Sequence, residues 1–89
     1  MALVLIKHGV HHPIARTKLG CSNENDCLVL IQDGIFWAIT GELEKPKSKV
    51  YALQEDFCAR GYQIEDADVT MIGYSDLVDL IVEAEETIT

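Results

Sequence analysis

The chain has 89 residues, of which 48% are hydrophobic, and its fifteen acidic and seven basic side chains give a net charge of −8. This apolar content is enough for a core and excludes intrinsic disorder. The negative charge repels phosphate backbones and anionic lipid, so we expect neither direct nucleic-acid binding nor membrane binding. No apolar run approaches the ~18 residues of a membrane span. We expect one small domain over residues 1–89. Because so small a domain buries little surface, we expect a partner or a second copy to complete its core.

The first apolar run and the cysteines indicate the compartment. Ala2–Ile6 is too short for a signal peptide and follows no basic region, so we expect a cytoplasmic protein. Three cysteines, an odd number, fit reduced thiols better than a disulfide framework. Cys27 begins an apolar run and Cys58 lies in a predicted helix, and we expect both to pack. Cys21 lies in a polar loop and is the candidate for an exposed, reactive thiol.

Two strands are predicted in the first third of the chain. Ala2–Ile6 is apolar throughout, as expected of a central strand in a parallel sheet. Pro13 suits the first position of a short helical segment, which Gly20 can close. Cys27–Ile31 is again apolar throughout and predicts the second strand.

The Asp33-Gly34 pair after the second strand is open to two interpretations. Asp-Gly between apolar runs is a strong signal for a hairpin with a type I′ turn. The following run, Ile35–Ile39, contains good strand formers, which supports that interpretation. However, the run does not alternate, and Asp33 could instead cap the start of a helix. Periodicity alone does not decide between them.

The next segment predicts a strand followed by a short helix. Val50–Leu53 is the third apolar run. Glu55 and Asp56 then suit the first turn of a helix, and Arg60 suits the last, because these charges complement the helix dipole. Gly61 is placed to end the helix in a left-handed conformation.

The C-terminal third predicts a fourth strand and an amphipathic helix. Val69–Ile72 is the strand, and Ser75 can cap the helix that follows. Apolar residues recur at helical spacing and form one face at Leu77, Leu80, Ile81 and Ala84. Val78 and Val82 widen this face. Carboxylates at the end of this helix oppose its dipole, so we expect that end to fray or to meet a basic partner.

Four apolar strands separated by helical segments predict an α/β fold with a mainly parallel sheet. Sites in such folds form where strands end and helices begin. Here those segments are His8-Gly9, Gln32–Gly34, Gln54–Asp56 and Gly73–Ser75. None has a phosphate-binding glycine pattern, so we expect no nucleotide cofactor.

Candidate chemistry along the chain is sparse. His8, His11 and His12 could supply imidazoles, but their spacing is not that of a zinc site, so we expect no metal. Asp33, with the acids after the third strand, could be catalytic, but acids at these positions also satisfy helix starts. Exposed Phe36 and Trp37 would form an interaction patch; in so small a chain, aromatic residues also serve the core or an interface.

Several ordered motifs resemble one known family. LVLIQDGIFWAI, KVYALQEDFCARGY and VTMIGYSDLVDLIVE, with the opening ALVLIKHG, resemble the DsrH/TusB family of small sulfur-relay proteins. The resemblance covers nearly the whole chain. It implies a three-layer DsrE/DsrF/DsrH-like α/β fold, with about four strands in the order 2-1-3-4 and with the Asp33-Gly34 segment turning into a helix.

The resemblance also implies a function. It is the handling of protein-bound persulfide sulfur in the cytoplasm, for 2-thiolation of the wobble uridine of tRNA or for intracellular sulfur oxidation. The implied partners are DsrE/TusD-like and DsrF/TusC-like subunits, or a second copy in a homodimer. The principal sulfur-carrying cysteine of these complexes belongs to the DsrE/TusD-like partner. The chain is therefore expected to act mainly as an assembly subunit without independent catalysis or cofactor.

Within that function, Cys21 is the candidate sulfur carrier. The candidates for an interface or a strand-end turn are Asp33, Gly34, Phe36, Trp37 and Tyr74. The alternative function is a homo-oligomeric α/β binding module without sulfur chemistry.

Overall fold

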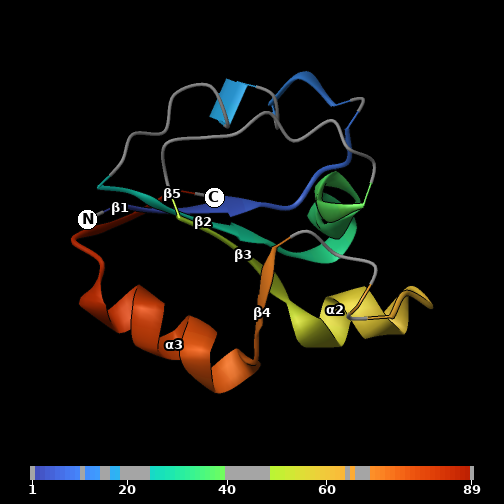
Figure 1. Cartoon of the computed structure of the whole chain (residues 1–89). Coiled ribbons are helices and arrows are strands. Elements are labelled where there is room, and N and C mark those ends of the chain that lie inside the picture. The colour runs from blue at the N-terminus through green and yellow to red at the C-terminus, as the bar shows by residue number, and fades with distance from the viewer. Residues whose placement is uncertain are drawn as a thin grey trace.

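Five parallel strands form the sheet of this protein in a computed structural model, which describes residues 2–10, 12–14, 17–18, 25–39, 49–63, 65 and 69–88. The strands are β1 (Ala2–Ile6), β2 (Cys27–Leu30), β3 (Lys49–Leu53), β4 (Thr70–Ile72) and β5 (Glu86–Ile88). The helices of the described residues include the 3₁₀ helix η1 (Gln32–Ala38), α2 (Gln54–Ala59) and α3 (Tyr74–Glu83). Figure 1 shows the sheet edge-on, with α3 beneath it. The predicted α/β class and parallel sheet are confirmed.

The predicted strand count and order, about four strands as 2-1-3-4, differ from the structure. The observed order is β4-β3-β2-β1-β5, so the first four strands lie in chain order and β5 returns to the free edge of β1. Parallel strands are joined by right-handed crossovers, and steps in one direction put every connection on the same face. Local apolar runs do not encode that direction. All three residues of β5 are exposed, so hydrophobicity could not reveal this strand.

Alternation along the strands gives the sheet two buried faces. One face joins Val4 and Leu28 to η1 and α2 through Trp37 and Phe57. The other joins Leu3, Cys27, Val29 and Ile72 to the inner side of α3. Both faces are covered, which explains why the runs of β1 and β2 are apolar without a break. The predicted three layers, helix on sheet on helix, are confirmed (Figure 1).

The start of α3 differs from the prediction. The cap is Gly73 and the helix starts at Tyr74, so Ser75 lies inside it. The Asp76 carboxylate accepts a hydrogen bond from the Gly73 N–H at 3.2 Å, which stabilises the first turn without a capping hydroxyl. At the other end, Ala84 turns to an extended conformation and leads into β5.

The cysteines divide between core and surface. Cys27 is 2% exposed at the start of β2, as predicted. Cys58, which we expected to pack, is exposed. Phe57 turns the buried side of α2 toward the sheet, and the next residue lies about 100° around the helix axis, toward solvent. Cys21 lies outside the described residues.

Candidate functional site

The end of β2 turns into η1 because a glycine permits a very close backbone approach. The Ile31 N–H still bonds to the Ile6 carbonyl at 2.9 Å, and Gln32 then takes a left-handed φ of 49°. A Cβ on Gly34 would lie 1.8 Å from the Ile6 oxygen, so η1 can cross the end of β1 only with glycine there. The Gly34 N–H bonds to the Ile31 carbonyl at 2.8 Å. The helical interpretation of Asp33-Gly34 is confirmed, and the hairpin is wrong.

Polar side chains tie the end of β2 to the helix that follows β3. The Gln32 N–H donates to the Asp56 Oδ2 at 2.7 Å. Arg60 donates from Nε and Nη2 to the Asp33 Oδ1, both at 3.3 Å. Its Nη1 also donates to the Asp56 carbonyl at 3.2 Å. Asp33 and Asp56 are therefore engaged in holding η1 and α2 together.

Two stacked histidines lie beyond the end of β1. The rings of His8 and His12 are 3.9 Å apart and nearly parallel, with an angle of 11°. Desolvation lowers the pKa of His8, and His12, Lys7 and Lys18 lower it further. The Ile14 N–H donates to the His12 Nδ1 at 3.2 Å, which leaves any proton of the neutral ring on Nε2.

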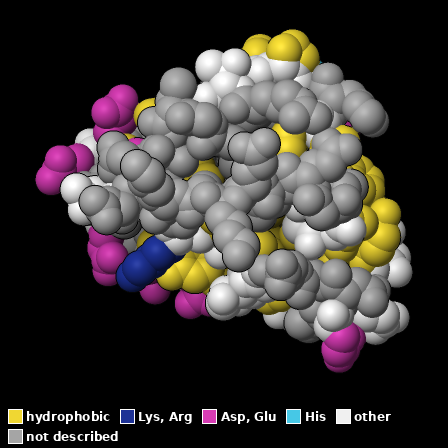
Figure 2. Space-filling view, turned by 45° about the horizontal axis from the view of Figure 1, so that its top comes forward, with side chains coloured by type: hydrophobic (Ala, Val, Ile, Leu, Met, Phe, Trp, Pro, Cys, Tyr) yellow, Lys and Arg dark blue, Asp and Glu magenta, His cyan; other side chains and the backbone are white. Residues whose placement is uncertain are grey.

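Lysine side chains gather at the same edge. The Lys18 Nζ donates to the carbonyl of Leu5, in β1, at 3.4 Å. Desolvation, followed by repulsion from Lys7, lowers the pKa of Lys18. The described part of this edge is therefore richer in basic groups than the rest of an acidic protein. Figure 2 shows Asp and Glu side chains mostly along the left side of the face, and also at the lower right.

The histidines that were considered as metal ligands and set aside are only partly described. His11 lies outside the described residues, and His8 stacks on His12. Within the described ranges, no three His, Cys, Asp or Glu side chains gather as metal ligands would.

The candidate residues named from sequence divide into three groups. Asp33 is exposed and Gly34 is buried, and both form the strand-end turn. Trp37 is 2% exposed, and its Nε1 donates to the His8 carbonyl at 3.0 Å, so it lies in the core. Phe36 is half-buried against the edge of Tyr62, and Tyr74 is 54% exposed at the start of α3.

The structure brings the four predicted strand ends to one edge. Besides the Asp33 and Asp56 contacts, the position of a Cβ on Gly9 lies 3.9 Å from the Asp33 carbonyl oxygen. A Cβ placed on Gly73 would likewise lie 3.6 Å from the Glu55 carboxylate. Sequence reasoning treated Arg60 only as a complement to the helix dipole. No spacing rule connects it with Asp33, 27 residues earlier.

The two described thiols differ in environment. Desolvation raises the pKa of Cys27, which a smaller effect of Lys49 opposes. Cys27 lies at the amino end of β2, away from the polar edge. Cys58 is the exposed thiol of the two.

Comparison with known proteins decides the family. The family model described as DsrH like protein matches residues 11–87. The chain belongs to the DsrH family. Protein TusB of Escherichia coli K12 is 43% identical to this DsrH-family chain in an alignment of 68 residues, which covers 68% of the chain and 70% of TusB.

Two solved structures from Thermotoga maritima share the DsrH fold. The solution structure of Tm0979 has a TM-score of 0.78 at 45% identity and covers 92% of each chain. Another structure, of the candidate sulfur transferase TM0979, has a TM-score of 0.75 at 47% identity over the whole of both chains. Among the described residues of the DsrH-family chain, no helix is long and apolar enough to cross a bilayer.

Proposed function

We propose that this chain is a subunit of a sulfur-relay system that handles protein-bound persulfide sulfur, in the branch leading to 2-thiolation of the tRNA wobble uridine. The observation that carries the proposal is the 43% identity to Protein TusB of Escherichia coli over 68 residues. The likeness to a candidate sulfur transferase of Thermotoga maritima, at 47% identity, also supports sulfur handling.

The proposed role is mainly assembly. Asp33, Asp56 and Arg60, three of the charged groups at the polar edge, are engaged with one another or with backbone. Cys27 is buried, and its raised pKa keeps it a thiol, the less nucleophilic form. The edge therefore offers a rigid surface, and the relay cysteine is assigned to a partner.

The proposed partners are DsrE/TusD-like and DsrF/TusC-like subunits in the cytoplasm. A net charge of −8 opposes binding of tRNA by this chain alone, so a more basic subunit is needed to hold it.

Any sulfur carried by this chain itself is assigned to Cys21. Its thiolate would attack the terminal sulfur of a donor persulfide. The new S–S bond leaves the persulfide on Cys21, and the old bond breaks to release the donor cysteine as thiolate.

Persulfide transfer and tRNA thiolation together test the proposal. The purified chain is incubated with a persulfide-charged donor, and the mass of each cysteine peptide is measured in wild type, Cys21→Ser and Cys58→Ser. The mass of one added sulfur atom, found in wild type and Cys58→Ser but not in Cys21→Ser, supports the carrier role of Cys21. If wild type gains no sulfur, the chain is not a carrier and its role is assembly only.

Deletion of the gene tests the relay itself. Loss of 2-thiouridine from tRNA, restored by the wild-type gene, is the expected result. Unchanged thiolation and no co-purifying DsrE-like or DsrF-like subunit would contradict the proposal and favour a homo-oligomeric binding module.

A further inference from the structure

The outer side of α3 carries apolar side chains that nothing in the described structure covers. Leu77, Leu80 and Ala84 pack against the sheet and form the inner side. The outer side presents an apolar stripe, at helical spacing, of Tyr74 (54% exposed), Val78 (55%), Ile81 (43%) and Val82 (78%). Single exposed apolar residues are ordinary on protein surfaces, but a continuous stripe marks an interaction site.

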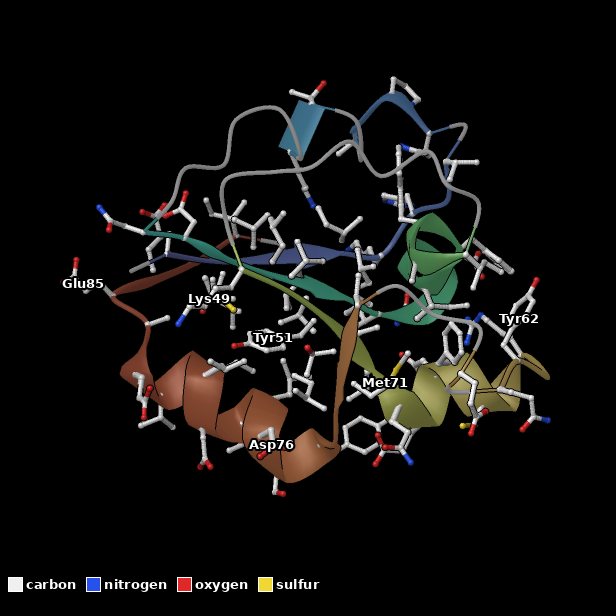
Figure 3. The ribbon with its side chains drawn as sticks, viewed as in Figure 1. Lys49, Tyr51, Tyr62, Met71, Asp76 and Glu85 are labelled. Atoms are coloured by element: carbon white, nitrogen blue, oxygen red, sulfur yellow. The ribbon has the colours of Figure 1, made fainter. Side chains whose placement is uncertain are left out.

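The stripe belongs to a segment of the sequence that carries acidic but no basic side chains. Residues 61–89 contain no Lys or Arg, and all seven basic residues lie in the first sixty. Five carboxylates belong to α3 or to the segment that follows it, at Asp76, Asp79, Glu83, Glu85 and Glu86. We call these five carboxylates the acidic border; Figure 3 shows Asp76 in the first turn of α3 and Glu85 beyond the end of the helix, level with the sheet.

Most of these carboxylates lack a basic partner among the described residues. Asp76 bonds to the Gly73 N–H, and the ion pair between described residues is that of Arg60 with Asp33. Lys49 lies in β3 with the parity of Tyr51, on the α3 side of the sheet, and forms no ion pair with another described residue. Glu83 ends α3, where the helix dipole is negative, so its charge is unfavourable until a cation approaches.

We propose that the outer side of α3 docks a partner subunit whose apolar groove is bordered by Lys and Arg. The inference rests on the proposed function and names the surface by which this chain joins the relay complex. The apolar stripe supplies buried area, and the carboxylates supply charge complementarity that directs the partner's orientation.

Charge argues against a second copy at this surface. A twofold dimer places the same surface against itself, so the five carboxylates of one copy would face five like charges. α3 has ten residues and is about 15 Å long at 1.5 Å per residue. A stable interface buries about 800 Å² per partner, so it must extend beyond the stripe and include the acidic border.

Binding of the DsrE-like and DsrF-like proteins encoded in the same genome tests the inference. Each is purified, alone and together, and titrated with this chain by calorimetry at low and high salt, about 50 and 300 mM. The apolar variant is Val78→Ser with Val82→Ser, and the charge variant is Glu83→Gln with Glu85→Gln and Glu86→Gln. Ile14→Ser is the control, because Ile14 is 51% exposed in the segment on the other side of the sheet.

The expected result is a loss of about tenfold or more in affinity for the apolar variant and no change for the control. The charge variant should bind more weakly at low salt and lose part of the salt dependence. Circular dichroism of each variant confirms that the fold is kept.

Three results would overturn the inference. If the wild-type chain binds the partners and both α3 variants bind them with the same affinity, this surface is rejected and the proposed function stands. Self-association of the chain that the apolar variant abolishes would assign the surface to a second copy. Absence of any wild-type complex would remove the proposed function and this inference together.

Discussion

Arg60 donates two hydrogen bonds to one oxygen of Asp33, from Nε and Nη2, and joins the turn after β2 to the end of α2. The Asp33 side chain is 66% exposed and that of Arg60 29% exposed, so water competes for both charges. Arg60 also holds the Asp56 carbonyl. The contact therefore orders the edge of the sheet more than it stabilises the fold.

Removing the Asp33–Arg60 pair is predicted to have a small effect on stability. Asp33→Asn should lower the free energy of unfolding by about 1 kcal/mol or less, because exposed ion pairs contribute little. Urea unfolding of Asp33→Asn, Arg60→Gln and the double variant gives the coupling energy. A coupling well above 1 kcal/mol would contradict the view that water screens this pair.

Gly34→Ala is predicted to destabilise the protein severely. The new Cβ would meet the Ile6 backbone oxygen, which cannot move without disturbing β1 and β2, so we expect a loss of about 2–4 kcal/mol. Gly9→Ala is the matched control, because its Cβ would lie 3.9 Å from the nearest atom, the Asp33 oxygen. It should stay within about 0.5 kcal/mol of wild type in urea unfolding. Equal effects of the two substitutions would disprove the close approach at Gly34.

The same contact shows where sequence reasoning stops. The apolar runs predicted β1 to β4 because both faces of the sheet are covered, which leaves no polar alternation. Whether Asp33-Gly34 formed a hairpin or a helix depended on Ile6, 28 residues earlier, and on no local preference. β5 was missed for the opposite reason: its residues are exposed, and pairing with β1 alone defines it.

The candidate site also has features that the sequence pattern predicts and features that depend on tertiary packing. The convergence of strand ends followed from parallel topology, which a pattern of alternating strands and helices predicts. The contact between Asp33 and Arg60 could not be predicted in this way, because the position of Arg60 depends on how α2 packs on the sheet. The exposure of Cys58 was mispredicted from its apolar neighbours, although the 3.6-residue period around Phe57 carried the answer.

The two described cysteines are predicted to differ in reactivity. Cys58 is exposed and should be alkylated readily by iodoacetamide. Cys27 is 2% exposed and its pKa is raised by desolvation, so it should react far more slowly. Peptide mass spectrometry over a time course measures both rates, with denatured protein as the control in which they converge. Comparable rates in the native state would mean that β2 opens readily.

The pH dependence near the stacked histidines has a definite sign. The folded-state pKa of His8 lies below its ordinary value of 6.5, because of desolvation and then of His12, Lys7 and Lys18. The unfolded chain therefore binds a proton at His8 first as the pH falls below 6.5, and the folded protein loses stability through that window. Above 6.5 both states are neutral and this contribution is flat.

An NMR titration of the His8 ring should accordingly give a midpoint below 6.5. His12→Gln removes one of the positive neighbours and should move the midpoint upward, toward that of an isolated imidazole. His8→Gln should flatten the slope of unfolding free energy against pH just below 6.5. A midpoint above 6.5 in the wild-type protein would show that Asp33, whose charge raises the pKa of His8, outweighs the stacked ring and the lysines.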